Sequence, residues 1–294
     1  MDYQQVLQNF RPQHKYYIGV DSDGCVFDSM EIKHKECFIP NIIKHWNLQA
    51  ISRTVRQTAE FVNLYSQWRG TNRFPALIKV FDLLQEHPDV IKYNIPIPKA
   101  APLRAFIQSG APLGVPALEE HYRIKKDPVL KQAVDWSRAV DASIEDMVKG
   151  VICFEPVPYV LERFQSQADI VVVSSTPHDA IVREWKEHDI EKYTSAIAGQ
   201  EMGNKRTQLQ VTTKNRYSKD HVLMIGDAPG DLKSAHAVGA RFYPIIPGQE
   251  YESWKKLDSE IVELFLNGKY TTRLETQLIE EFNTNLPQTP PWQI

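Results

Sequence analysis

The strongest constraint on the fold of this chain is a short apolar run that ends in two carboxylates. The run is residues 16–20, Tyr-Tyr-Ile-Gly-Val, and the two carboxylates that follow it are Asp21 and Asp23. Gly24 comes next, and a third acid, Asp28, lies four residues after this glycine. The run predicts a buried strand, and ligands of α/β sheets bind outside the carboxyl ends of the strands. Two acids at such an end repel each other and are costly to desolvate, and a divalent cation removes that cost. An acidic turn is the alternative interpretation, because Asp and Gly are ordinary turn residues.

The composition indicates a globular protein and argues against several classes. The chain has 294 residues, 42% of them hydrophobic and 24% charged, which is enough for one large or two medium domains. The net charge of −3 argues against nucleic-acid binding, which favours basic proteins. No apolar run approaches the ~20 residues of a membrane span, and residues 1–15 lack the apolar segment of a signal peptide. Three cysteines without C-x-x-C spacing fit reduced thiols, so we expect a cytoplasmic protein. From the net charge and the lack of a long apolar run, we expect neither nucleic-acid nor membrane partners.

Strand and helix patterns alternate in the second half of the chain. Strands are predicted at residues 170–173, 195–198, 221–225 and 241–246, and helices at 158–165, 177–188, 231–238 and 253–266. Thr176 is expected to cap the helix that begins at Pro177. This alternation implies parallel pairing and a doubly wound sheet.

Residues 30–150 show helical patterns and no strand pattern. The pattern is interrupted near Gly70–Pro75, and the proline-rich stretch 89–116 predicts loops around one short helix. We therefore predict an α/β core formed by residues 1–29 and 151–294, with a helical tail from about 249. An all-helical cap domain, residues 30–150, is inserted directly after the acidic end of the first strand.

Polar side chains also follow three later strands or begin the helices after them. They are Ser174, Ser175, Lys205, Asp227 and Asp231. Each has an ordinary interpretation, as a helix cap, a solvated surface lysine or an acidic turn. Together with the first acid pair, they supply the charges that a phosphoryl group needs.

These motifs resemble those of the haloacid dehalogenase-like superfamily, mainly phosphohydrolases, in the subgroup with a helical cap between the first and second motifs. The matching positions are Asp21-Ser22-Asp23-Gly24, Ser174, Lys205 and residues 226–231. The resemblance implies a Rossmann-like, doubly wound core at residues 1–29 and about 151–248. Cys25 departs from the pattern, since threonine or valine is commoner there, and we interpret it as a packing variant.

The resemblance implies roles in phosphoryl transfer. Asp21 would be the nucleophile that forms an aspartyl-phosphate, and Asp23 would be the general acid. Ser174 would bind a phosphate oxygen with Ser175 beside it, and Lys205 would balance the phosphate charge. Because the family's dehalogenases lack an acid at the position of Asp23, C–halogen cleavage is disfavoured.

The resemblance also implies a Mg²⁺ cofactor. The ion would be held by the Asp21 side chain, the Asp23 backbone carbonyl and the Asp227 side chain, with water and a phosphate oxygen completing an octahedron. Asp231 would orient the lysine without touching the metal. Asp28 is left as a structural residue at the cap hinge.

Several cap residues are candidates for substrate contact. Arg69 and Arg73 flank Gly70 in a helix-breaking segment, where arginine suits phosphate or carboxylate, although a solvated turn is an equally good interpretation. Lys33 or Lys35 could form a Schiff base, as in phosphonate-cleaving members, but solvated lysine is the usual case. Outside the cap, His178 could contact substrate or lie on the surface.

We therefore expect a Mg²⁺-dependent phosphatase acting on a small phosphorylated metabolite. A sugar phosphomutase is the nearest alternative, because it shares the fold and the nucleophile. A phosphonate-cleaving hydrolase and a non-catalytic ligand-binding module are further alternatives. The intact acid pairs argue against the module.

Overall fold

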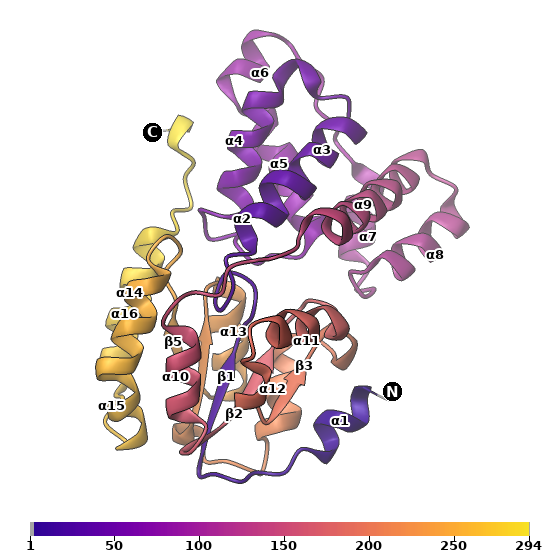
Figure 1. Cartoon of the computed structure of the whole chain (residues 1–294). Helices are drawn as coiled ribbons and strands as arrows, with labels where there is room; N and C mark the ends of the chain where they lie inside the picture. Colours follow the sequence, from indigo (N-terminus) through magenta and orange to yellow (C-terminus); the bar gives the residue numbers. More distant parts are fainter. Residues whose placement is uncertain (1–2, 294) are drawn as a thin grey trace. The chain divides into compact units, whose positions relative to one another are not determined.

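The computed structural model describes residues 3–293 and contains two compact units. The core unit comprises the residues up to Ser29 and Val151–Asn285. The helical unit comprises Met30–Gly150 and the residues from Leu286 onward. The chain thus leaves the core unit after its first strand and returns to it at Val151 (Figure 1).

The core unit is built on a five-stranded parallel sheet with strand order β3-β2-β1-β4-β5 (Figure 1). The strands are β1 Tyr16–Val20, β2 Ala168–Val173, β3 Ala196–Ala198, β4 Val222–Gly226 and β5 Arg241–Pro244. Each pair is parallel, which requires crossover connections and confirms the predicted doubly wound α/β class. Val20 is in register with Val172 and Ile225, so the residues that follow β1, β2 and β4 share one edge of the sheet.

Helices pack on both faces of this sheet. They are α1 Tyr3–Asn9, α10 Val157–Phe164, α11 His178–Glu187, α12 Lys205–Thr213, α13 Pro229–Val238, α14 Glu250–Lys256, α15 Val262–Leu266 and α16 Thr272–Asn285. Leu209 of α12 packs in one apolar cluster with Tyr17 and Met224 of the sheet. Because successive strand residues face opposite sides of a sheet, Tyr16 faces away from Tyr17. The Tyr16 ring lies 5.2 Å from the ring of Phe265 in α15, between centroids.

The described residues of the helical unit form helices, turns and loops, and no strand. Its α-helices are α2 Met30–Ile32, α3 Ile39–His45, α4 Ser52–Asn63, α5 Arg73–Gln85, α6 Pro88–Lys92, α7 Ala101–Gln108, α8 Val115–Lys125 and α9 Pro128–Met147. Aromatic rings pack together in its apolar core. The Trp46 ring lies 5.6 Å from the Trp136 ring and 5.3 Å from the Phe81 ring, between centroids. This unit therefore has a hydrophobic core of its own.

Shorter helical turns complete both units. π-helical turns lie at Lys33–Phe38 and Leu257–Ile261, and 3-10 turns at Gln49–Ile51, Glu191–Tyr193, Gln200–Met202, Lys219–His221 and Pro291–Gln293. The stretch 89–116 contains α7 and most of α6, so it is more helical than the sequence predicted. Its prolines did not prevent helix formation, because proline is accepted in the first turn of a helix. Within residues 3–293, every helix is too short or too polar for a transmembrane span.

The last residues of the chain group with the helical unit, and not with the core in which the sequence analysis placed them. The Trp292 ring lies 5.7 Å from Phe61 and 5.1 Å from His87 between centroids. The N–H of Gln67 donates to the carbonyl of Pro287 at 3.4 Å. Contacts between residues distant in the sequence hold this segment, and periodicity does not reveal such contacts.

Candidate active site

The carboxyl ends of β1 and β4 bring acidic side chains together. β1 ends at Val20 and β4 at Gly226. The N–H of Asp21 still donates to the carbonyl of Ile225 at 3.0 Å, which extends the strand pairing by one residue. Asp21 and Asp227 therefore leave the sheet at the same edge, where α/β proteins bind ligands.

Lys205, the first residue of α12, lies between two buried carboxylates. Its Nζ is 2.8 Å from Asp21 Oδ2 and 2.6 Å from Asp231 Oδ1. Burial raises the pKa of Asp21 well above its ordinary range, Lys205 opposes that shift, and Asp231 and Asp227 add to it. Burial lowers the pKa of Lys205, but the two acids outweigh burial and hold that pKa above its ordinary value. The lysine therefore stays charged at neutral pH.

The position of Asp231 depends on the first turn of α13. Its Oδ2 accepts the N–H of Ala228 at 3.1 Å, while its other oxygen faces Lys205. A Cβ at Gly226 would lie 2.5 Å from the Asp231 Cβ, so only glycine fits at the end of β4. Gly226 is thus required for Asp231 to approach the strand end.

Three carboxylates at this edge could hold a metal ion. Oxygens of Asp21, Asp227 and Asp231 lie within 4.8 Å of one another, and all three side chains are buried. Lys205 contacts two of the three acids. Carboxylate oxygens are the ligands that hard divalent cations prefer. The donor set therefore fits Mg²⁺.

Asp23 faces the end of β2. Its Oδ2 accepts the hydroxyl of Thr176 at 2.6 Å, and its Oδ1 accepts the hydroxyl of Ser29. Ser174 is buried, and its Oγ accepts the N–H of Thr176 at 3.1 Å. Ser175 is exposed beside it. The structure thus brings together the acids, the serine and the lysine that the sequence analysis singled out in the core.

A comparison with known protein families finds one model that matches part of the chain. Residues 115–245 match the model of the haloacid dehalogenase-like hydrolases. The match includes Ser174, Lys205 and Asp227, and the structure supplies Asp21 from outside the matched range. Over this range, the chain is similar to the haloacid dehalogenase-like hydrolases. A search of curated proteins found no significant match.

Solved structures that resemble the chain include several proteins named for this superfamily or for phosphatases. One from Bacteroides fragilis, named for the haloacid dehalogenase-like hydrolases, has 15% identity and a TM-score of 0.47, with 81% of this chain and 93% of that chain covered. A protein from Haemophilus somnus named as a predicted phosphoglycolate phosphatase has 14% identity and a TM-score of 0.44, with 79% and 85% covered. A protein from Clostridium acetobutylicum named as a predicted phosphatase has 14% identity and a TM-score of 0.43, with 91% and 100% covered.

The two arginines suggested for substrate contact have partners inside the helical unit. Arg69 is buried and donates to the carbonyl of Leu64 at 3.0 Å. Arg73 donates to Asp141 Oδ1 at 2.7 Å and to Ser137 Oγ at 2.8 Å. These contacts account for both side chains without a ligand.

The structure also shows the burial and the contacts of the other residues that the sequence analysis singled out. Lys33 is buried, with 8% of its surface exposed, and is not the solvated lysine that its helical position predicted. Lys35 pairs with Glu31. The His178 ring lies 5.1 Å from the Tyr3 ring between centroids. Cys25 is fully buried.

Sequence reasoning missed Thr176 and Ser29 as site residues. Thr176 was expected to cap α11, but the helix begins at His178 and no side chain caps it. The hydroxyl of Thr176 instead points to Asp23. The only sequence signal for Thr176 is its place two residues after Ser174, and for Ser29 its place six residues after Asp23.

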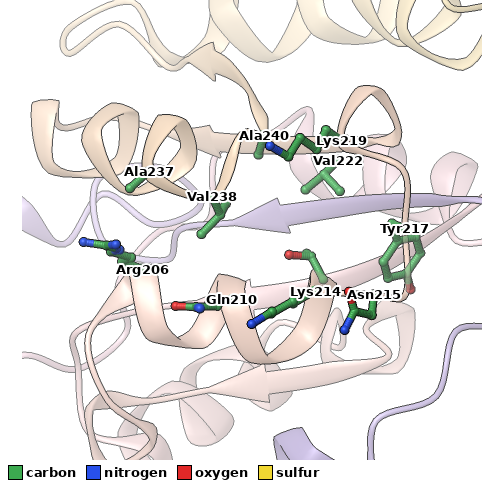
Figure 2. Close-up of a pocket in the computed structure, with 11 residues that line it drawn as sticks. Arg206, Gln210, Lys214, Asn215, Tyr217, Lys219, Val222, Ala237, Val238 and Ala240 are labelled. Atoms are coloured by element: carbon green, nitrogen blue, oxygen red, sulfur yellow. The ribbon is translucent and has the colours of Figure 1, made fainter.

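A groove elsewhere in the core unit lies between α12 and α13 (Figure 2). It encloses about 370 Å³, and its side chains include the cationic Arg206, Lys214 and Lys219. Val222 opens β4 and Ala240 directly precedes β5, so the groove extends to the amino ends of these strands. None of the candidate site residues lines it. The groove is therefore separate from the acidic edge.

Proposed function

We propose that this hydrolase is a Mg²⁺-dependent phosphatase that acts on a small phosphorylated metabolite. The observation that carries the proposal is the contact of Lys205 with both Asp21 and Asp231 beside Asp227. A nucleophilic carboxylate, a fixed cation and a hard-metal site are the parts that phosphoryl transfer requires.

Asp21 is the proposed nucleophile. Its Oδ1 accepts the N–H of Ser22 at 2.8 Å, and its Oδ2 faces Lys205, so both oxygens have fixed directions. One carboxylate oxygen forms a bond to phosphorus while the bond to the leaving oxygen breaks, which gives an aspartyl-phosphate. Lys205 favours the ionised carboxylate that this attack needs and balances charge on the phosphoryl oxygens.

Asp23 is the proposed proton donor to the leaving oxygen. After the first step it accepts a proton from the water that attacks the aspartyl-phosphate, which releases phosphate and restores Asp21. Ser174 and the exposed Ser175 would bind phosphoryl oxygens at the end of β2. An acid at position 23 favours phosphate-ester over C–halogen substrates.

Mg²⁺ would be held by the side chains of Asp21 and Asp227 and by the backbone carbonyl of Asp23. When bound, the ion offsets the negative charge of the carboxylates and of the phosphoryl group. Asp231 keeps Lys205 in place. We also propose a cytoplasmic location, supported by three cysteines that form no disulfide.

A substrate panel tests the proposal. The full chain is incubated with Mg²⁺ and sugar phosphates, nucleotides and p-nitrophenyl phosphate, and released phosphate is measured. We expect release that depends on Mg²⁺ and that falls at least about 10³-fold in Asp21→Asn. Asp28→Asn, an exposed acid of the same loop, is the matched control and should keep wild-type turnover.

Two outcomes would overturn the proposal. An isomerised sugar phosphate without free phosphate would identify a phosphomutase instead. Binding of phosphorylated ligands with no turnover of any substrate would identify a ligand-binding module. Unchanged turnover in Asp21→Asn would reject the nucleophile.

A further inference from the structure

We propose that Thr176 is a positioning residue that aims the carboxyl group of Asp23 at the leaving oxygen. This inference rests on the proposed phosphatase function, in which Asp23 is the proton donor. Thr176 itself does not touch the reacting atoms. It acts through the orientation of Asp23, and Ser29 provides the second contact.

Both carboxylate oxygens of Asp23 are held by hydroxyl groups. Thr176 Oγ1 donates to Oδ2 at 2.6 Å, and Ser29 donates to Oδ1. The two hydroxyls come from different loops, one after β2 and one at the end of the β1 loop. Two donors on opposite oxygens oppose rotation of the carboxyl group, whereas one donor would leave it free to swing.

Thr176 is itself anchored by its backbone. Its N–H donates to Ser174 Oγ at 3.1 Å, and its carbonyl accepts the N–H of Gln200 at 3.0 Å. Both backbone polar groups are therefore engaged, and the side chain projects from a fixed support. Thr176 thereby connects the proposed proton donor to Ser174, the proposed phosphate ligand.

Thr176 does not play the ordinary role of a threonine before a helix. Such a residue usually caps the helix with its hydroxyl. Here α11 begins at His178, its N-terminal flanking residue is Pro177, and no side-chain cap is made. The hydroxyl of Thr176 therefore has no function in the helix, and its partner is Asp23.

The chemical consequence depends on the leaving group. An alkoxide leaves only with a proton, whereas a nitrophenolate leaves without one. General acid catalysis contributes about 10²–10⁴-fold to rate, and small misplacements of a catalytic group lose part of such a factor. Loss of the Thr176 hydroxyl should therefore slow alkyl phosphates far more than p-nitrophenyl phosphate.

The test compares kcat/KM for two substrates in Thr176→Val, which keeps the shape of the side chain and removes its hydroxyl. The substrates are p-nitrophenyl phosphate and the best alkyl phosphate of the panel, and kcat/KM is used because it reports the step in which the leaving group departs. We expect a loss of about 10–100-fold for the alkyl phosphate and less than about 3-fold for p-nitrophenyl phosphate. Thr176→Ser should restore the alkyl phosphate rate.

Two further variants keep the test decisive. Ser29→Ala removes the other donor and should show the same leaving-group dependence, so the inference can be judged even where Thr176→Val does not fold. Thr194→Val removes a half-buried hydroxyl that donates to the carbonyl of Glu191 at 2.8 Å, and it should leave both rates unchanged.

The outcomes separate this inference from the function on which it rests. Equal losses for both substrates, no loss, or a gain in Thr176→Val would overturn the role of Thr176 while the phosphatase stands. A wild-type protein that hydrolyses neither substrate would overturn the phosphatase and this inference together.

Discussion

The two units of this chain differ in where they hold carboxylate groups. In the core unit, Asp21, Asp227 and Asp231 are buried together at one edge of the sheet. In the helical unit, the core is an apolar cluster, and ion pairs such as Arg104–Asp82 are partly exposed. Burying carboxylates is costly, and apolar packing is not. The core unit therefore carries an arrangement that folding alone does not favour, which is typical of functional sites.

Removing the charge of Lys205 should have the largest effect on stability and on activity. In Lys205→Met, the buried Asp21 and Asp231 lose their shared partner, which should lower the free energy of unfolding by about 3–5 kcal/mol. kcat/KM should fall by about 10²–10³-fold. Chemical denaturation and phosphate-release assays measure the two effects.

The control is Lys214→Met, at the other end of α12, where the lysine is exposed. It should change neither stability nor turnover. A Lys205→Met protein as stable as wild type would show that the buried charges do not depend on this lysine.

The helical unit should be most sensitive to loss of an aromatic ring. Trp136 is 1% exposed, so Trp136→Ala should cost about 3–5 kcal/mol, while Tyr93→Ala, at 61% exposure, should cost less than about 0.5 kcal/mol. Thiol labelling locates the effect: Cys37 is buried in the helical unit and Cys25 in the core unit. We expect faster labelling of Cys37 with little change at Cys25.

Labelling of both thiols at the same accelerated rate would show that the units unfold together. Burial raises the pKa of each thiol, so a native cysteine is a poor nucleophile and labelling reports opening. The experiment therefore tests whether the two units are independent as well as distinct.

Mg²⁺ should stabilise the protein by a smaller amount that depends on pH. Burial raises the pKa of Asp21, so the metal-free fold is stabilised below the ordinary carboxyl pKa and loses that stability as pH rises through the raised value. A bound cation offsets this loss of stability. The increase in the free energy of unfolding on Mg²⁺ binding should therefore be larger at pH 7 than at pH 5. At a concentration 100 times its Kd, the gain should be about 2.7 kcal/mol.

Thermal unfolding with and without Mg²⁺ measures this gain. Asp227→Ala should reduce it strongly, and Asp28→Asn should leave it intact. An undiminished gain in Asp227→Ala would place the metal elsewhere.

The sequence alone determined the α/β class, and it predicted the inserted helical segment and the residues that meet at the strand ends. Each rests on a regular rule: apolar runs predict strands, alternation with helices predicts parallel pairing, and residues after parallel strands share an edge. Asp21, Lys205, Asp227 and Asp231 therefore emerged as one group before any contact was known.

Only the tertiary structure decided which side chains touch. Thr176 holds Asp23 and does not cap a helix, and Trp292 places the end of the chain on the helical unit. Arg73 contacts Asp141, and Lys33 is buried. These outcomes depend on rotamers and on contacts between distant residues, which neither periodicity nor spacing encodes. A hydroxyl two residues after a motif serine looks the same in a sequence whether it caps a helix or orients an acid.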